Sequence, residues 1–249
     1  MKIKKKAPKP SSRRPPPYFV GYRGTAPLAD ELKIWFDLEY GGPLIVRQDQ
    51  EARESWQVNH GPWSAHIVIP LPESHRVGLK DQFAWEHDMI GTVAPSMVPP
   101  CDMPDTILSA ARLARGLTLL TQGTSCDITT QQYLNPSDWK DQELMGFLIT
   151  DHILISQDDN ATTEEIRHYT LGLSKFGLDD LEIFQSRGLP ERIAEELLIE
   201  SAHELIRLGR SPKVGTALHL PLLGRTVRIA SHRTASPRGR MLSFREIRT

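Results

Sequence analysis

One short segment with two glycines, residues 168–184, limits most strongly what this chain can fold into. Gly172 and Gly177 separate two apolar runs, and each glycine is able to adopt the positive φ angle of a tight turn. Residues 169–173 alternate in polarity before the turn and residues 181–184 alternate after it, which is typical of half-buried strands. The segment therefore predicts a strand, a turn built on both glycines, and a second strand.

The second of these strands has a clear two-residue period. Leu181 and Ile183 share one face, and we expect them to be buried against a helix from Pro190 to Leu208. Asp180 and Glu182 fall on the opposite face, where we expect them to tolerate substitution better. On this interpretation the segment is structural and not catalytic.

Two helices are predicted by strong local signals. Pro104 opens a pattern of apolar residues at helical spacing, and Gly123 is a suitable stop. Pro190 opens the best helix of the chain, with acidic residues early, Arg207 late and Gly209 after it. Its buried side is expected to comprise Ile193, Leu197, Ala202, Leu205 and Leu208.

Weaker patterns predict the remaining elements. Strands are expected at 18–20, 44–46, 65–71, 127–133, 147–155, 217–220, 225–230 and 241–247, and helices at 28–36 and 79–90. Three prolines argue against regular structure over residues 92–103. Helices that alternate with strands before a set of closing strands indicate an α+β protein. We expect a mixed or mainly antiparallel sheet with helices packed on it, and a single core that two similar halves could build.

Length and composition are those of a globular protein. The 249 residues suit one large domain or two small ones, and 39% hydrophobic residues with 24% charged residues are ordinary values. No apolar run approaches the roughly 20 residues that span a bilayer. The basic N-terminus lacks the apolar stretch of a secretory signal, and Cys101 and Cys126 do not have CxxC spacing. We therefore expect a cytoplasmic protein with two ordinary thiols, and keep a disulfide between them as the lesser alternative.

Three sections are expected along the chain. Residues 1–17 combine lysines and arginines with five prolines and predict a disordered basic tail. Residues 18–53 are expected to form an N-terminal extension, and residues 54–249 an α+β domain.

Charge is unevenly distributed along the sequence, although the net charge is only -1. Residues 1–17 carry seven Lys and Arg and no acid, and residues 205–249 carry ten against the single Glu246. The C-terminal arginines are Arg225, Arg228, Arg233, Arg238, Arg240, Arg245 and Arg248. They could pair with the acidic helix that contains Glu195, Glu196, Glu200 and Glu204, or they could contact phosphate or an acidic partner.

The glycine segment also resembles a known family. The matching residues are Thr170, Leu171-Gly172-Leu173, Phe176-Gly177 and Asp180-Leu181-Glu182. They are similar to a signature of the bacterial domain-of-unknown-function family numbered 4261, and the similarity extends over residues 54 to 249 with one longer insertion before Pro104. That family has no established activity, so the resemblance implies a fold and leaves the function open.

Two histidines are the best candidates for catalytic chemistry. His60 and His66 flank a predicted turn, with Trp56 and Trp63 nearby. A turn can direct two imidazoles into one pocket, but a metal site needs three or four ligands, and aromatic packing at a surface turn is the favoured interpretation.

Other catalytic motifs are missing or weak. The pairs Glu165…His168 and Glu200…His203 have the spacing of di-iron ligands, but this spacing arises readily by chance. There is no nucleophile elbow, Walker loop, HExxH or dinucleotide-binding motif. Cys126 follows a predicted helix C-terminus, whose negative dipole raises a thiol pKa, so an activated cysteine is not expected.

Three functions are therefore compared, with no catalytic, cofactor or metal residue assigned. The first is a non-enzymatic protein-binding or accessory module, because the core is well patterned and no catalytic constellation is evident. The second is a nucleic-acid-contacting protein that uses the basic N- and C-terminal segments. The third is a hydrolase-like enzyme with a site near His60 and His66.

Overall fold

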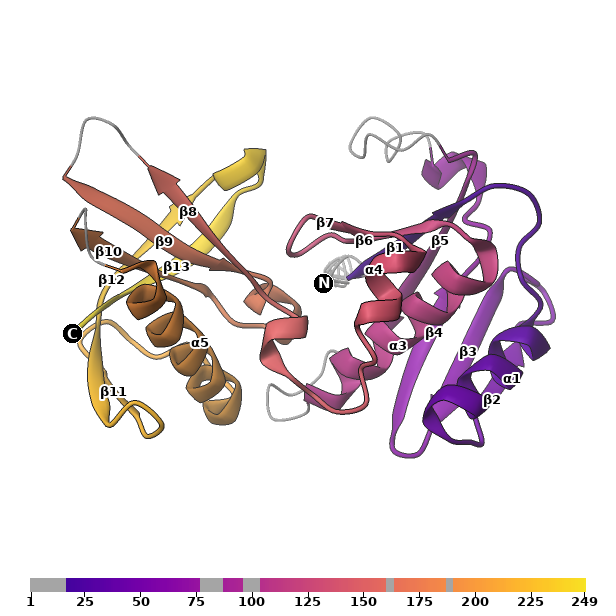
Figure 1. The fold of residues 1–249 in the computed structure, drawn as a ribbon. Helices are drawn as coiled ribbons and strands as arrows, with labels where there is room; N and C mark the ends of the chain where they lie inside the picture. Colours follow the sequence, from indigo (N-terminus) through magenta and orange to yellow (C-terminus); the bar gives the residue numbers. More distant parts are fainter. Residues whose placement is uncertain (1–16, 77–86, 96–103, 160–163, 187–189) are drawn as a thin grey trace, which may run out of the picture.

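The computed structural model describes residues 17–76, 87–95, 104–159, 164–186 and 190–249. Within these ranges the protein is an α+β structure with two sheets, one of seven strands and one of six. Figure 1 shows the two sheets side by side, each with its own helices, so the chain builds two halves in sequence order. The prediction of an α+β fold is confirmed.

The first half is built on an antiparallel sheet with the order β2-β3-β4-β5-β1-β6-β7. Its strands are β1 (Tyr18–Tyr22), β2 (Ile45–Gln48), β3 (Ser55–His60), β4 (Trp63–Val68), β5 (Met89–Pro95), β6 (Thr124–Asp127) and β7 (Gln132–Leu134). Strand β1 lies inside the sheet, between β5 and β6. Residues 18–53, expected as an N-terminal extension, therefore contribute a central strand of this sheet.

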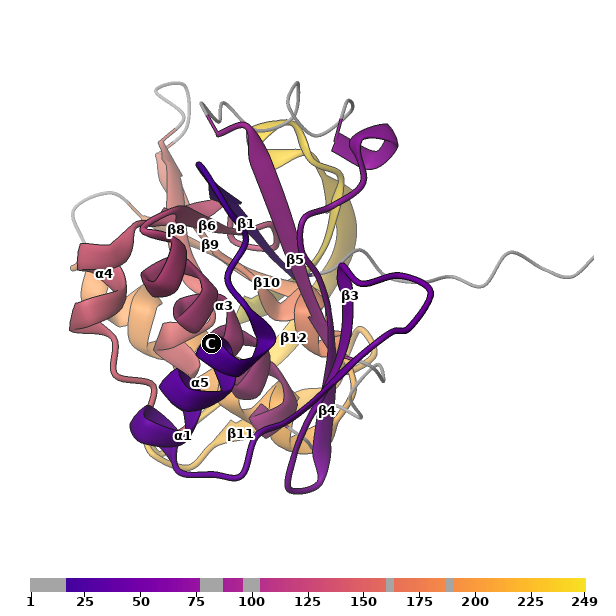
Figure 2. The same cartoon turned by 90° about the vertical axis from the view of Figure 1, so that its right-hand side faces the viewer.

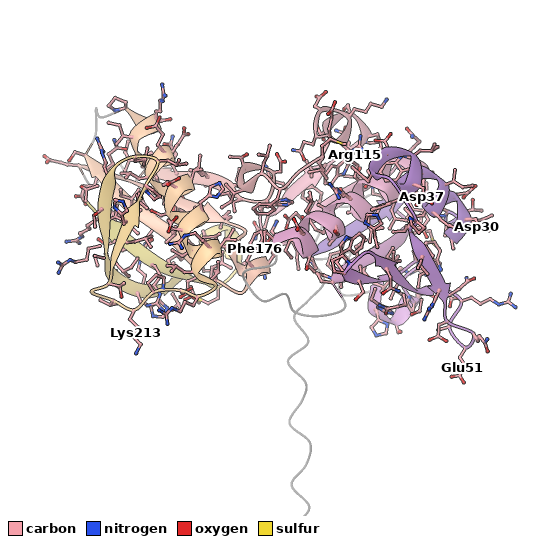
Figure 3. The ribbon with its side chains drawn as sticks, turned by 90° about the horizontal axis from the view of Figure 1, so that it is seen from below. Asp30, Asp37, Glu51, Arg115, Phe176 and Lys213 are labelled. Atoms are coloured by element: carbon pink, nitrogen blue, oxygen red, sulfur yellow. The ribbon has the colours of Figure 1, made fainter. Side chains whose placement is uncertain are left out.

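Two long helices, α1 (Ala29–Tyr40) and α3 (Pro104–Thr121), cover one face of this sheet, and the short α4 (Pro136–Asp141) packs beside α3. Figure 2 shows α1 and α3 together on the same side of the strands. Gly116 allows α1 to approach α3, because a Cβ there would lie 2.5 Å from the ring of Trp35. Arg115, labelled in Figure 3, donates to the Trp139 carbonyl and pairs with Glu39, which ties α3 to both other helices.

The second half is built on a mixed sheet with the order β11-β12-β13-β10-β9-β8. Its elements are η1 (Ile149–Asp151), β8 (Leu154–Asp159), β9 (Glu165–Leu171), η2 (Leu173–Phe176), β10 (Asp180–Ser186), α5 (Glu191–Leu208), β11 (Ala217–Leu220), β12 (Arg225–Ala235), η3 (Pro237–Gly239) and β13 (Leu242–Arg248). Strands β10 and β13 are parallel, and the other pairs are antiparallel. Helix α5 packs on one face of the sheet.

The buried apolar residues form one large cluster in each half and two smaller ones. The large cluster of the second half contains Leu181 and Ile183 together with Leu197, Leu205 and other residues of α5. The predicted packing of the second strand against this helix is confirmed. Ile193 and Leu208 were expected on the same buried side, but each is 38% exposed. They lie near the two ends of α5.

The glycine turn is as predicted. Gly172 and Gly177 have φ angles of 119° and 82°, and they flank the short helix η2 between β9 and β10. Asp180 and Glu182 lie on the opposite face from Leu181, as expected, but they are 1% and 0% exposed. Other side chains cover this face of the sheet, and this burial argues against the expectation that the two acids tolerate substitution better.

Four weaker predictions were also wrong in whole or in part. Residues 92–95 belong to strand β5, and residues 89–90, expected to end a helix, begin the same strand. The single strand expected at 127–133 is instead the end of β6, a turn over residues 128–131 and the start of β7. The apolar run 147–155 contains η1, and a strand begins only at Leu154. Residues 87–88 of the helix expected at 79–90 are not helical, and residues 79–86, with all of the tail except Pro17, lie outside the described residues.

Candidate functional site

A buried ion pair joins the two halves. Lys175 of η2 donates to the carboxylate of Asp127 at the end of β6, and both side chains are almost inaccessible to solvent. The other oxygen of Asp127 accepts from the backbone and hydroxyl of Thr129, at 2.8 and 2.6 Å. Phe176, which follows Lys175, lies at the boundary between the halves in Figure 3. The turn after β6 and the glycine turn are therefore held against each other.

Asp180 organises the glycine turn from the inside. Its Oδ1 accepts from the Leu173 backbone at 3.0 Å and from the Thr170 hydroxyl at 3.1 Å, and that hydroxyl also accepts from the backbone of Leu181. Burial raises the pKa of Asp180 to about 7, although these hydrogen bonds and Lys175 favour the charged form. The residues that resemble the family signature thus form one hydrogen-bonded unit.

His152 is the least satisfied polar group of this region. Its ring stacks on Phe147 with centroids 5.0 Å apart, and neither ring nitrogen has a hydrogen-bond partner among the described residues. Burial first, and then the charge of Lys175, lower the pKa of His152 to about 3. The imidazole is therefore neutral at physiological pH.

These groups do not form a catalytic arrangement. Asp127 and Asp180 are both occupied by internal hydrogen bonds, and His152 has no hydrogen bond to either. Burial, and secondly Asp127, raise the pKa of Cys126 to about 12, so this thiol is not a nucleophile at neutral pH. The raised pKa has the direction expected from the sequence. Its main cause is the burial of the thiol rather than the helix dipole.

Three C-terminal arginines are held by carboxylates of their own half, namely Arg233, Arg245 and Arg248. Glu182, whose side chain is fully buried, binds Arg167 at 2.7 Å and Arg233 at 2.6 Å. Arg245 pairs with Asp179 at 2.8 Å, and Arg248 pairs with Glu246 at 2.6 Å. Arg240 donates to the carbonyl of Ile128. These partners are residues of the sheet and its turns rather than the acidic residues of α5.

Two C-terminal arginines are not bound by a carboxylate of the described residues. Arg225 and Arg228 of β12 are exposed, and neither forms an ion pair within the described ranges. Two further exposed basic residues, Arg210 and Lys213, lie between α5 and β11 and are also without an ion pair there. Lys213 projects from the outer end of the second half in Figure 3. Lys213 thus lies just before β11, and Arg228 and Arg225 lie opposite its first and last residues, whereas Arg210 precedes Ser211, whose hydroxyl accepts from the backbone of Asp179.

A groove runs beside these residues, between the end of α5 and strand β11. It has a volume of about 350 Å³. Its lining comprises Glu204, Arg207 and Leu208 of α5, Ala217, Leu218 and His219 of β11, and Pro221 of the following turn. Arg207 binds both oxygens of Glu204, so that carboxylate is neutralised. Exposed apolar side chains lie in or beside the groove: Leu208 (38%), Val214 (53%) and Leu222 (83%).

Strand β11 forms one edge of the sheet, because it pairs only with β12. Figure 1 shows it on the outer side of the second half. Gly215 has a φ of 89°, its backbone donates to the carbonyl of Ile229, and the Ile229 backbone donates to Thr216. These bonds form a bulge that fixes the register of the two strands. Because hydrogen-bonded pairs alternate along an antiparallel ladder, Ala217 and His219 direct their backbone groups towards the free edge.

The two histidines singled out from the sequence are not brought together. His60 on β3 is paired with Trp63, packs on the ring of Phe36 and bonds to the Gly41 carbonyl at 3.0 Å. His66 on β4 is exposed and bonds to the Ser55 hydroxyl at 2.7 Å. His60 is on the core-facing side of the hairpin and His66 is on the other side, as the register shows.

Among the described residues, no group of three or more His, Cys, Asp or Glu side chains is placed so that it could hold a metal ion. In the Glu165…His168 pair the histidine is buried and the acid exposed, whereas in the Glu200…His203 pair the acid is buried and the histidine exposed. Neither pair presents two ligands to one space.

Comparisons with protein-family models, with curated proteins and with solved structures found no match for this chain. The resemblance to the family numbered 4261 therefore stays a prediction. Within the described ranges, no helix combines the length and the apolar character that crossing a bilayer requires.

The groove was not among the sites expected from the sequence. The pattern 217–220 predicts a strand correctly, but it does not show that the strand lies at an edge of the sheet. The only available signal was the excess of basic residues after residue 205.

Proposed function

We propose that this protein is a non-enzymatic binding module that accepts an extended segment of a partner protein as an added strand beside β11. The observation that carries the proposal is the groove between α5 and the free edge of β11, where apolar side chains lie next to backbone groups that have no strand partner. Addition of a strand to a sheet edge is a recurring mode of peptide recognition.

The added strand would make two kinds of contact. The backbone groups of Ala217 and His219 would form the ladder hydrogen bonds, which give affinity that does not depend on the peptide sequence. Every second side chain of the peptide would enter the groove and cover Leu208 and Leu218. These alternate side chains would give selectivity.

The absence of a catalytic arrangement in the junction supports a binding role over the enzyme alternative. Asp127 and Lys175 pair with each other there, Asp180 is bonded within the glycine turn, and the two candidate histidines face opposite sides of a hairpin. The nucleic-acid alternative has less support than the sequence implied, because four C-terminal arginines are engaged within the protein.

A substitution by proline tests strand addition directly. Ala217→Pro removes one backbone donor from the free edge and leaves the ladder between β11 and β12 intact, since proline is tolerated where the missing N–H faces solvent. Peptides selected from a random display library on the wild-type protein should lose most of their affinity for this variant. The matched control is Gln48→Pro, at an exposed position of β2, the edge strand of the other sheet, where the same alternation directs the N–H of residue 48 away from β3.

Amide chemical shifts locate the bound peptide independently. A selected peptide should shift and protect the amides of Ala217 and His219 and leave those of β2, the edge strand of the other sheet, unchanged. Selected peptides that bind the Ala217→Pro variant as tightly as the wild type, or that shift amides elsewhere, would contradict the proposal. Failure to select any peptide would also count against it.

A further inference from the structure

We infer that the segment bound beside β11 is acidic, and that its acidic residues alternate with apolar ones. This inference rests on the proposed function. It comes from the different chemistry on the two faces of the sheet at this edge, because an added strand sends successive side chains to opposite faces.

The face towards α5 is apolar. Leu218 and Leu220 point to this side and belong to the core cluster, and Leu208 extends it to the surface. The two charged side chains of the groove, Glu204 and Arg207, neutralise each other. A peptide side chain that enters here is therefore apolar.

The face away from α5 is basic. Arg228 is paired with Ala217 and lies on the same face, and Thr226 and His219 form the next pair along that face. Lys213 lies in the turn that leads into β11, where its carbonyl accepts from the backbone of Thr216. Arg225 is paired with Leu220 and therefore lies on the α5 face, at the far end of the strand and outside the groove lining. The negative end of α5 contributes only about half a charge of opposite sign. The far face of a strand that carries no acid thus holds Arg228, a cation without an ion pair among the described residues.

Charge complementarity also argues against two other occupants. The N-terminal residues 1–17 carry seven basic residues and no acid, so they would be repelled from this edge. A second copy of β11 would place Lys213 and Arg225 of one molecule near the same residues of the other. A partner with carboxylates has neither difficulty.

The alternation defines the probes. An eight-residue labelled peptide in which Val and Glu alternate should bind the wild-type protein, as measured by fluorescence anisotropy. A peptide with Lys in place of Glu, and a peptide with four Val followed by four Glu, should each bind about tenfold more weakly or worse. The first comparison tests the sign of the charge and the second tests the alternation.

Charge reversal provides the matched variants. Arg228→Glu should weaken the Val–Glu peptide about tenfold and strengthen the Val–Lys peptide, because the sign of the contact is exchanged. Lys33→Glu, on an exposed position of α1 in the other half, should change neither affinity. Both are surface substitutions, and circular dichroism checks that each variant is folded.

Several outcomes would overturn the inference. Equal binding of the Val–Glu and Val–Lys peptides, or equal binding of the alternating and block peptides, contradicts it. If an eight-nucleotide thymidine strand binds more tightly than the Val–Glu peptide, the basic residues beside β11 bind nucleic acid instead. If Arg228→Glu instead causes self-association without changing peptide affinity, the charges serve to keep sheet edges apart.

The two proposals can fail separately. If library peptides bind at β11 without a preference for acidic residues, the proposal of strand addition stands and the inference about charge fails. Binding of the Val–Glu peptide that depends on Arg228 and is unchanged by Ala217→Pro would preserve the charge preference and remove strand addition.

Discussion

Lys175 and Asp127 form an ion pair across the boundary between the two sheets, and less than a tenth of either side chain is exposed. The lysine belongs to the turn between Gly172 and Gly177, and the carboxylate ends a strand of the other half. The ring of Tyr18 on β1 lies 5.5 Å from the same ammonium. The glycine turn is therefore a structural joint of the molecule as well as a connection between β9 and β10.

Removing one partner of this pair should be costly. Lys175→Met leaves the charge of Asp127 buried without its cation, and we expect a loss of about 3–5 kcal/mol in the free energy of unfolding. Urea denaturation measures this loss. Lys33→Met, at an exposed position of α1, should change stability by less than about 0.5 kcal/mol. A loss below about 1 kcal/mol for Lys175→Met would show that the pair is screened by water.

The two turn glycines should respond differently to the same substitution. Gly172→Ala places a Cβ 2.6 Å from the carbonyl oxygen of His152 at a φ of 119°, so we expect a loss above about 2 kcal/mol. Gly177 has the left-handed conformation, φ 82° and ψ 16°, and Gly177→Ala should cost about 1 kcal/mol. Gly177→Asn should cost less, since asparagine tolerates this conformation. Equal losses for the two alanine variants, measured by urea denaturation, would contradict the role assigned to the His152 contact.

Local sequence signals predicted the elements that depend on local chemistry. Helix α5 has proline before it, Arg207 in its last turn and Gly209 with a φ of 66° after it, and each of these can be read without knowing the fold. Strand β5 could not be predicted in this way. Its residues pair with β1 on one side and β4 on the other, and Gly91 allows the side chain of Ile69 to pack closely. These partners lie far away in the sequence, and Pro95 is tolerated because it is the last residue of the strand.

The candidate site depended even more on tertiary structure. Alternating polarity in 180–184 implied that one face meets water, but Arg167 from the neighbouring β9 and Arg233 from β12, two strands away, neutralise Glu182 on that face. The edge position of β11 likewise follows from the order of strands in the sheet, which no short pattern encodes. Sequence could suggest a basic C-terminal section, but only the fold shows which of its charges are paired internally.

The core contact predicted for the strand after the glycine turn gives a further test. Leu181 is 0% exposed and packs in the cluster that contains α5, so Leu181→Ala should lower the free energy of unfolding by about 2–5 kcal/mol through lost burial and a cavity. Leu148→Ala, at a side chain that is 61% exposed, is the matched control and should cost less than about 1 kcal/mol. Similar losses in urea denaturation would place Leu181 outside the cooperative core.

Two buried groups near the junction should affect the pH dependence of stability in opposite directions. The folded pKa of Asp180 is about 7 against an ordinary value of 3.8, so its contribution to stability falls as pH rises between these values. The folded pKa of His152 is about 3 against 6.5, so its contribution is complete above pH 6.5 and is lost as pH falls towards 3. Between about pH 4 and 6.5 the two contributions should largely cancel in the wild-type protein.

Asp180→Asn separates these two contributions. The amide oxygen can still accept from Leu173 and Thr170, but the side chain no longer titrates. The free energy of unfolding of the variant minus that of the wild type should therefore increase with pH, by up to about 1.4 kcal/mol per pH unit between about pH 4 and 7. Urea denaturation at half-unit intervals across this range measures the difference, with Asp30→Asn on the exposed side of α1 as the control. A difference that stays constant with pH would show that Asp180 is already ionised in the folded protein at pH 4, and that the hydrogen bonds of the glycine turn outweigh its burial.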